Sequence, residues 1–365
     1  MSDTRGSGSW ARDSVETLKN SGALSSAARK PPEPRAPSRE SRLLQVTHLT
    51  TGFDQDGRFV PAVIDVSFSV VAGETLCLVG ESGSGKSLTA LSIMRLIQPP
   101  GSIASGQIVF KNRDLLALSE REMQRVRGAE IGLVFQETMT ALNPVYTIGN
   151  QLEETLRIHG RATRADARRK AIELLASVSV PEPERRVDEY AHQLSGGLRQ
   201  RALIALALAC GPDLLIADEP TTALDVTIQA QILDLLRDLQ QRLGLALLLI
   251  THDLGVVAEM ADRVAVMYAG RLVEEATAEE LFADPRHPYT RGLMASMPGG
   301  APGVRLKAIQ GTVPPLGHLP PGCAFAPRCP DRFEPCSIAP PGATPIGESR
   351  SVKCYLSGPA TEASS

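Results

Sequence analysis

The sequence lacks an apolar run long enough to cross a membrane. Its longest apolar stretches, at 202–210 and 243–250, fall well short of the roughly 18 residues that a spanning helix needs. The opening residues, MSDTRGSGSW, also lack the apolar core of a secretory signal. We therefore expect an intracellular chain that has no membrane segment of its own.

The chain also lacks an excess of basic residues. Its 38 Lys and Arg are outnumbered by 41 Asp and Glu, which gives a formal net charge of -3. Domains that bind nucleic acid usually carry a basic patch and a positive net charge. We expect no nucleic-acid partner, and the 365 residues, 42% of them hydrophobic, suffice for one large domain or two modest ones.

Cysteine is scarce over most of the chain and concentrated near its end. Cys77 and Cys210 lie in apolar segments, which predicts that they are core residues. The other four follow residue 320 with the spacing C-x5-C-x6-C-x17-C. Disulfides are rare inside cells, so the cluster favours metal ligation, although it lacks the tight C-x2-C pair usual for structural zinc. Four thiolates suit zinc or an iron–sulfur cluster.

Strand and helix patterns alternate from residue 43 onward. Alternating segments of this kind predict an α/β fold with a mostly parallel sheet and helices on its faces. Residues 1–42, rich in Ser, Arg, Pro and Ala, predict a disordered tail, and Pro and Gly dominate after residue 300. The expected strands are 74–80, 131–136, 213–218 and 246–252, with a hairpin turning at Ala269-Gly270, and the expected helices are 86–97, 197–210, 227–243 and several within 150–190, where Ile172, Leu174, Leu175 and Val178 form an apolar face.

GESGSGKS, at 80–87, matches the phosphate-binding loop G-x-x-x-x-G-K-[ST]. It follows a predicted buried strand and opens a predicted helix, which is the context that the motif requires. Glycines let backbone N–H groups turn toward a phosphate, and the helix N-terminus adds a favourable dipole. Lys86 would reach the β- and γ-phosphates, and Ser87 would hold Mg²⁺. The expected ATP-binding residues are Gly80, Glu81, Ser82, Gly83, Ser84, Gly85, Lys86, Ser87 and Leu88.

A second acidic motif, LLIADEP, should reach the same edge of the sheet. Its apolar residues form a strand that delivers Asp218 beside the phosphate loop, where Asp218 would support the metal ion. Glu219 follows directly and could polarise a water that attacks the γ-phosphate.

A second glycine-rich helix start, LSGGLRQR at 194–201, narrows the class of phosphate-loop protein to which the chain could belong. An ordinary helix cap would explain Ser195, but not two such helix starts in one nucleotide-hydrolysing chain. Two copies would be expected to share each ATP, one presenting its phosphate loop and the other its LSGG segment.

With these motifs in place, the chain from about residue 43 to 355 resembles the ATP-binding subunit of an ATP-binding-cassette (ABC) transporter. The resemblance implies an ATPase with a P-loop core, an antiparallel β subdomain and a helical subdomain. It divides the chain into a nucleotide-binding domain at 43–275, helical at about 137–195, and a C-terminal extension at 276–365. It also implies a second ATPase subunit, identical or related, two transmembrane permease subunits, an extracytoplasmic solute-binding protein, and a place on the cytoplasmic face of the inner membrane as a peripheral subunit.

The resemblance also assigns residues to roles. Gln136 would ligate Mg²⁺ and sense the membrane subunit, Asp225 would be the aspartate of the D-loop, and His252 would hold the γ-phosphate. Phe53 would stack on adenine, but an inserted DQDGRF offers Phe59 as a rival. Together these give the catalytic set Glu219, His252, Lys86 and Gln136, the Mg²⁺ set Ser87, Gln136 and Asp218, and the signature Ser195, Gly196, Gly197 and Gln200, which would act on the partner's ATP.

The tail carries a more specific resemblance. ADPRHPYTRGLMASMP, together with the cysteine-rich block, resembles the extension of the oligopeptide, dipeptide and nickel importers. In that branch the matching cysteines, Cys323, Cys329, Cys336 and Cys354, are implied to hold a [4Fe–4S] cluster, with zinc and unliganded thiols as alternatives. The expected cargo is di- or oligopeptide, with nickel, glutathione or another small solute as the alternative. A soluble, non-transport ATPase of the same superfamily is the distant alternative for the function of the chain.

Overall fold

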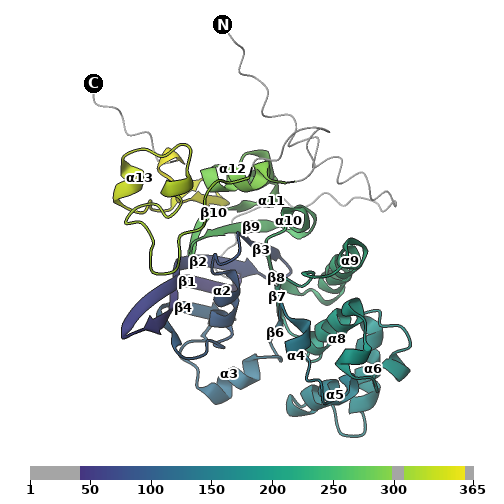
Figure 1. The fold of residues 1–365 in the computed structure, drawn as a ribbon. Helices are drawn as coiled ribbons and strands as arrows, with labels where there is room; N and C mark the ends of the chain where they lie inside the picture. Colours follow the sequence, from purple (N-terminus) through teal and green to yellow (C-terminus); the bar gives the residue numbers. More distant parts are fainter. Residues whose placement is uncertain (1–41, 298–307, 358–365) are drawn as a thin grey trace.

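The computed structural model describes residues 42–297 and 308–357 (Figure 1). The tail expected at 1–42 therefore lies outside the described residues, except for Arg42, which begins strand β1. Two sheets and a separate group of helices make up the described chain.

The main sheet has eight strands in the order β11-β12-β10-β9-β3-β8-β7-β6. Its strands from β9 to β6 run parallel, and the other three add antiparallel at one edge. Every residue of β3 and β8 is buried, as expected for a parallel sheet covered on both faces. The strands are β3 (Thr75–Val79), β6 (Ile131–Val134), β7 (Leu214–Asp218), β8 (Ala246–Thr251), β9 (Arg263–Tyr268), β10 (Arg271–Thr277), β11 (Thr344–Ile346) and β12 (Arg350–Val352).

The two faces of the main sheet belong to two hydrophobic cores. Leu76 and Leu78 of β3 pack into one core with the antiparallel sheet and helices α2 (Lys86–Ile93) and α3 (Glu120–Val126). Cys77 packs into the other, together with most of the other helices. Alternate residues of a strand point to opposite faces, so the chain must place helices or a second sheet on both sides.

The second sheet is antiparallel, in the order β2-β1-β4-β5. Asp56 and Gly57 have φ angles of 54° and 77° and join its long hairpin, as a two-residue type I′ turn requires. The hairpin lies at the lower left of Figure 1. Its strands are β1 (Arg42–Gln55), β2 (Arg58–Val71), β4 (Gly101–Phe110) and β5 (Arg113–Asp114).

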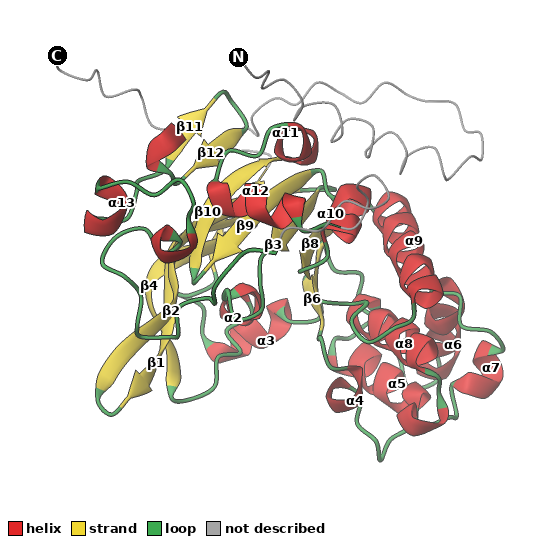
Figure 2. Ribbon diagram, turned by 45° about the horizontal axis from the view of Figure 1, so that its top comes forward, coloured by secondary structure: helices red, strands yellow, loops and turns green. Residues whose placement is uncertain are grey.

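A group of helices stands apart from the sheets at the lower right of Figures 1 and 2. Leu175 of this group is buried as expected, but Ile172 and Leu174 are only half-buried, and Ala167 and Ala171 take the inner positions instead. The helices are α4 (Thr138–Ala141), α5 (Ile148–Ile158), α6 (Ala167–Ser177), α7 (Pro183–Arg186) and α8 (Gly196–Leu208), and α9 (Val226–Leu243) and α10 (Leu254–Met260) lie nearer the main sheet.

The C-terminal extension completes the main sheet. The hairpin expected at Ala269-Gly270 is confirmed. Thr277 and Glu280 form a capping box that opens α11 (Ala278–Ala283). Strand β12 then pairs with β10, so the extension is built onto the main sheet. The boundary at residue 275 stays a prediction. The remaining helices are α12 (Pro288–Ala295) and α13 (Pro335–Ile338).

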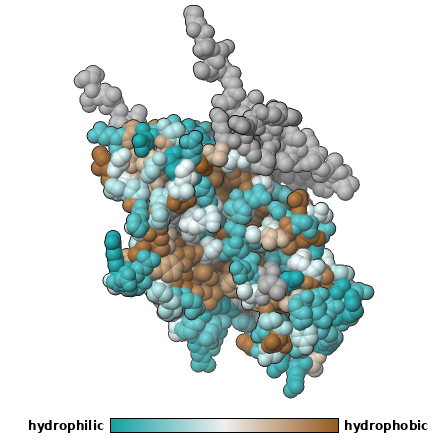
Figure 3. All heavy atoms as spheres, viewed as in Figure 1, coloured by the Kyte–Doolittle hydropathy of each residue, from teal (hydrophilic) through white to brown (hydrophobic). Residues whose placement is uncertain are grey.

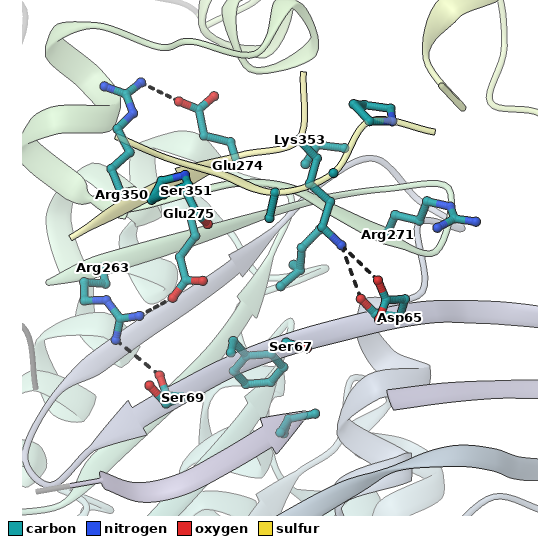
Figure 4. Close-up of a pocket in the computed structure, with 18 of the residues that line it drawn as sticks. Asp65, Ser67, Ser69, Arg263, Arg271, Glu274, Glu275, Arg350, Ser351 and Lys353 are labelled. Atoms are coloured by element: carbon teal, nitrogen blue, oxygen red, sulfur yellow. Dashed lines mark hydrogen bonds and ion pairs between the residues drawn. The ribbon is translucent and has the colours of Figure 1, made fainter. Parts of the chain in front are cut away.

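Charged pairs line the cleft between the extension and the antiparallel sheet (Figure 4). This cleft encloses about 880 Å³. Lys353 of the extension lies 3.4 Å from Asp65 of β2, and Arg350 pairs with the fully buried Glu274 of β10. The extension is thereby tied to both sheets.

One expected helix is shorter than its pattern. The apolar spacing at 86–97 predicts a helix to residue 97, but α2 ends at Ile93. Arg95 has a φ of 51°, in the left-handed region that a helix cannot include. Its guanidinium donates to the carbonyls of Leu115 and Leu118, and these bonds hold the chain in the turn.

Candidate functional site

The phosphate loop connects β3 to α2, as the motif predicts. Gly80 has a φ of 156°, and a Cβ there would lie 2.1 Å from the carbonyl oxygen of Met267. Gly85, with a φ of 100°, is the N-cap of α2. Only glycine fits both positions, so the loop's glycines are required by its close approach to β9 and by its helix start.

Lys86 is held inside this loop. Its side chain is largely buried, and Nζ donates to the carbonyl oxygens of Gly80 at 2.8 Å and Glu81 at 3.0 Å. Burial lowers the pKa of Lys86, although the carboxylates of Glu219 and Asp218 oppose that shift. The ammonium group therefore sits where a bound phosphate would replace weak carbonyl partners with full negative charge.

Ser87 and Asp218 meet across the loop. The hydroxyl of Ser87 donates to Oδ1 of Asp218 at 3.1 Å. Burial raises the pKa of Asp218, and the hydrogen bond from Ser87 works against that rise. A hydroxyl and a carboxylate at this separation are oxygen ligands of the kind that Mg²⁺ takes in nucleotide sites.

Glu219 has an unusual backbone and three side-chain partners. Its φ of 46° lies in the left-handed region, which costs energy for a non-glycine residue and is found at turns and at functional sites. Its carboxylate accepts from Gln136 Nε2 at 3.0 Å and Thr222 Oγ1 at 2.8 Å, and lies 3.1 Å from His252 Nδ1. Burial pushes the pKa of Glu219 upward, but the hydrogen bonds of Thr222 and His252 outweigh it, so the net shift is downward.

Gln136, Glu219 and His252 line one pocket of about 360 Å³ together with the start of the phosphate loop, whereas Lys86, Ser87 and Asp218 are not among its lining residues. The sequence places Gln136, Glu219 and His252 far apart along the chain, and the sheet brings them together at its carboxyl edge, as expected for an α/β fold. Sequence reasoning missed Leu293 of α12, which also lines the pocket. The full lining is Val79, Gly80, Glu81, Ser82, Gln136, Glu219, His252, Leu254 and Leu293.

The signature residues lie outside that pocket. Ser195 caps α8, accepting from Leu198 N at 3.4 Å, and Asp225 caps α9 in the same way, at 3.0 Å from Ile228 N. A Cβ on Gly197 would lie 2.7 Å from Ile228 Cγ2. The glycine therefore lets the LSGG segment pack against the start of α9. Gln200 is buried, and its Nε2 has no hydrogen-bond partner.

The two aromatic candidates lie on the β1–β2 hairpin. Phe53 is half-buried in β1 and pairs across the sheet with Val60 and Gly101. Phe59 is 37% exposed, and neither ring lines the 360 Å³ pocket. The stacking role stays a prediction for both.

The four tail cysteines gather at a second, small pocket. Cys323, Cys329, Cys336 and Cys354 all line it, although 31 residues separate the first from the last. Burial raises the pKa of the Cys329 thiol to about 11 and also raises that of Cys323 and Cys354. Cys77 and Cys210 are buried in the core, as predicted.

A buried imidazole faces the same sulfur-lined pocket. His287 accepts the N–H of Tyr289 through Nδ1, so its proton is on Nε2, and that buried Nε2 has no partner. A donor beside four thiols suits an anionic sulfur-bound group. However, residues 42–297 and 308–357 contain no group of three or more His, Cys, Asp and Glu side chains arranged to hold a metal ion, so the sulfurs do not surround one ion site.

Comparison with known proteins identifies two families along the chain. A family described as "ABC transporter" matches residues 63–222, and one described as "Oligopeptide/dipeptide transporter, C-terminal region" matches residues 273–336. Among the described residues, no helix is both long and apolar enough to span a bilayer.

Curated relatives match over most of their length. The dipeptide transport ATP-binding protein DppD of Bacillus subtilis is 50% identical over 86% of this chain and 95% of its own. The oligopeptide transport ATP-binding protein AppD of the same organism is 51% identical over 87% and 97%. Among solved structures, a dimeric, post-hydrolysis ATP-binding cassette bound to ADP and Pi, MJ0796, is 29% identical with a TM-score of 0.58, covering 64% of this chain and 98% of that one.

Proposed function

The chain belongs to the ABC transporter ATPases, and from that premise we propose that it powers the import of di- or oligopeptides by a membrane complex. The observation that carries this proposal is the match of residues 273–336 to the C-terminal region of oligopeptide and dipeptide transporters. The names of the relatives, which specify dipeptide and oligopeptide transport, point to the same cargo. The alternative cargo for the same ATPase subunit is nickel, glutathione or another small solute.

In this proposal the 360 Å³ pocket holds the phosphates of ATP. The loop from Gly80 to Leu88 wraps them with backbone N–H groups, and Lys86 exchanges its two carbonyl partners for β- and γ-phosphate oxygens. Ser87, Asp218 and Gln136 would hold Mg²⁺, which supplies neutralisation of the charge on the β- and γ-oxygens. Phe53 or Phe59 of the hairpin would stack on adenine.

Glu219 is the proposed general base. Its pKa is held low, so the carboxylate is ionised at neutral pH and can orient and deprotonate an attacking water. His252 lies 3.1 Å from one carboxylate oxygen, where its imidazole can meet the γ-phosphate. Positioning and charge stabilisation do most of the work in phosphoryl transfer, and the contact between His252 and Glu219 supports these roles.

The signature completes the site of a partner ATPase chain. Ser195, Gly196, Gly197 and Gln200 do not reach the pocket of their own chain, and a second subunit, identical or related, would receive them head to tail. Asp225 lies beside the signature at the start of α9 and would contact the partner as well. The dimeric arrangement described for the MJ0796 cassette supports this assembly.

The helical part at about 137–195 would pass the motion to two permease subunits. Within it, Val145 and Tyr146 are 71% and 51% exposed, shortly before α5 in the segment that follows Gln136. Figure 3 shows small hydrophobic patches on an otherwise hydrophilic surface over these helices. The complex would hold this chain peripherally at the cytoplasmic face of the inner membrane and receive cargo from an extracytoplasmic binding protein.

The four tail cysteines are proposed to hold a [4Fe–4S] cluster, with zinc as the alternative. Their convergence on one pocket, beside the unpartnered Nε2 of His287, supports a group held by sulfur. A zinc ion needs its four sulfurs about 2.3 Å away, and the described side chains form no such single-ion group. The group would supply folding energy to a Pro/Gly-rich segment that has little core of its own.

Transport by the reconstituted complex tests this function. The chain, its permeases and its binding protein would be reconstituted in liposomes, with ATP supplied on the side of the membrane where the ATPase subunits lie. Uptake of labelled tripeptide, dipeptide, glutathione and nickel would then be compared. We expect ATP-dependent peptide uptake that disappears in Glu219→Gln. Uptake of nickel or glutathione without peptide uptake would transfer the proposal to the alternative cargo, and ATP hydrolysis that no solute stimulates would overturn the transport role.

A further inference from the structure

Glu81, the second residue of the phosphate loop, is bound by an arginine of the cysteine-bearing extension. Arg328 precedes Cys329 in sequence, and its guanidinium donates to both carboxylate oxygens of Glu81, at 2.7 and 3.1 Å. The Arg328 side chain is only 5% exposed. A two-point guanidinium–carboxylate pair fixes orientation as well as distance, so the position of Glu81 is set by a residue 247 positions away.

The backbone of Glu81 is fixed at two more points. Its N–H donates to the hydroxyl of Tyr289 in α12 at 2.9 Å. Its carbonyl oxygen accepts from Lys86 Nζ at 3.0 Å and from Ser84 N at 3.2 Å. Glu81 therefore joins the extension on one side to the phosphate-binding lysine on the other.

Arg328 is itself held in one place by rigid neighbours. The guanidinium lies 5.7 Å from the centre of the Tyr268 ring and 3.3 Å from the Tyr268 hydroxyl. Its Nε donates to the carbonyl of Gln310. Three aromatic rings pack together with their centres 4.6 to 5.4 Å apart, those of Tyr268, Tyr289 and Phe325. This aromatic cluster gives the Arg328 side chain a rigid support.

We infer that Arg328 is a positioning residue for ATP: through Glu81, the C-terminal extension holds the phosphate loop in its binding conformation. Arg328 touches no reacting atom, and its effect is to keep the loop ordered before ATP arrives. A loop that is competent only part of the time binds with an affinity lowered by that fraction. If loss of Arg328 leaves about one loop in ten competent, the apparent Kd for ATP rises about tenfold.

The test compares ATP affinity in full-length variants by titration with a fluorescent ATP analogue and Mg²⁺. Arg328→Gln is expected to raise the Kd about tenfold, with kcat at saturating ATP within about twofold, because the machinery for hydrolysis is intact. Glu81→Gln should raise the Kd similarly. The double variant should be no worse than either single one, because both remove the same contact. Arg328→Lys should restore part of the affinity, since one ammonium meets the carboxylate without the two-point grip.

Arg291→Gln is the matched control. Arg291 also ties α12 to the cysteine-rich segment, through Asp331 at 2.8 Å, but neither residue contacts Glu81. An unchanged Kd in Arg291→Gln beside a raised Kd in Arg328→Gln supports the inference. An unchanged Kd in a folded Arg328→Gln overturns it, and so does an equal rise in both variants, since that would reflect general loosening of the extension.

The inference rests on the proposed assignment of residues 80–88 as the ATP loop, and Lys86→Ala separates the two. If Lys86→Ala binds the analogue normally, the assignment itself fails and the inference fails with it. If Lys86→Ala loses binding while Arg328→Gln keeps it, only the inference is overturned. Thermal melting and metal content of each variant establish that the compared chains are folded alike.

Discussion

The side-chain amide of Gln136 lies 3.0 Å from the carboxylate of Glu219, so a residue at the end of β6 holds one that follows β7. The sequence assigned Gln136 to Mg²⁺ and Glu219 to water. The geometry adds a direct contact between the two. Gln136, which lies in the segment that leads to the helical part, therefore contacts the proposed base Glu219. A movement of those helices could change the position of Glu219 through this one contact.

Glu219→Gln should bind ATP and hydrolyse it very slowly. The amide keeps the size of the side chain but cannot accept a proton, and loss of general base catalysis typically costs about 10²- to 10⁴-fold in rate. Nucleotide affinity and single-turnover hydrolysis would be measured on the same preparation. Near-normal turnover would refute the assignment of Glu219 as the base.

Thr222→Val should move the acid limb of the pH–rate profile to higher pH. The Thr222 hydroxyl stabilises the ionised carboxylate of Glu219 at 2.8 Å, and it is one of the groups that hold the pKa of Glu219 below its usual value despite burial. Removing it raises the pKa, so protonation inactivates the base at a less acidic pH. The measurement is kcat/KM against pH, which reports the free enzyme.

Thr222→Ser is the control for that shift. It retains the hydroxyl, and its acid limb should coincide with that of the parent chain. If Thr222→Val and Thr222→Ser give the same profile, the hydroxyl has no influence on Glu219.

Ser195→Arg should abolish ATP hydrolysis without weakening ATP binding to the single chain. The bulky cation would block the LSGG segment from meeting a partner's nucleotide, while the 360 Å³ pocket of the same chain is untouched. Lys86→Ala, by contrast, should lose both. Equilibrium binding to dilute, monomeric protein distinguishes them, and an equal loss of affinity in the two variants would argue against a shared site.

Iron, acid-labile sulfide and zinc should be assayed in protein purified without oxygen. We expect about four iron and four sulfide per chain with broad visible absorbance, the composition of a cluster with four cysteine ligands. Cys336→Ser should lose the metal, whereas Cys210→Ser, which changes a core cysteine, should retain it. If only zinc is found, zinc replaces the iron–sulfur cluster as the proposed cofactor. If a chain that still hydrolyses ATP contains no metal, the proposal of a cofactor at these cysteines is wrong.

The sequence predicted which residues would meet at the proposed ATP site better than it predicted their neighbours. The motif spacing identified Lys86, Ser87 and Asp218 because backbone geometry restricts which residues can occupy a phosphate loop and the strand end beside it. Thr222 and Leu293 carry no such restriction, since many residues could fill those places, and only the folded chain brings Thr222 to the Glu219 carboxylate and Leu293 to the pocket. Leu293 belongs to the ADPRHPYTRGLMASMP segment, whose pattern indicated a branch of the family but not its contact with the proposed nucleotide site.

The same reasoning explains the extension. A Pro/Gly-rich stretch without periodicity predicts a separate module, because short strands leave little pattern. Strand β12 has three residues, and its place is fixed by pairing with β10 and by the contact of Arg350 with the buried Glu274. Long-range pairing of this kind cannot be read from local sequence.

The pairing of β12 with β10 has a consequence for any shortened version of the chain. Strand β10 would be the outermost strand of the ATPase sheet if the chain stopped after α12, and its unpaired N–H and C=O groups would face solvent. Bare edges of this kind recruit strands from other molecules. A chain cut after α12 should therefore self-associate, which would give β12 a role in preventing aggregation that is separate from the proposed role of Arg328 at the phosphate loop.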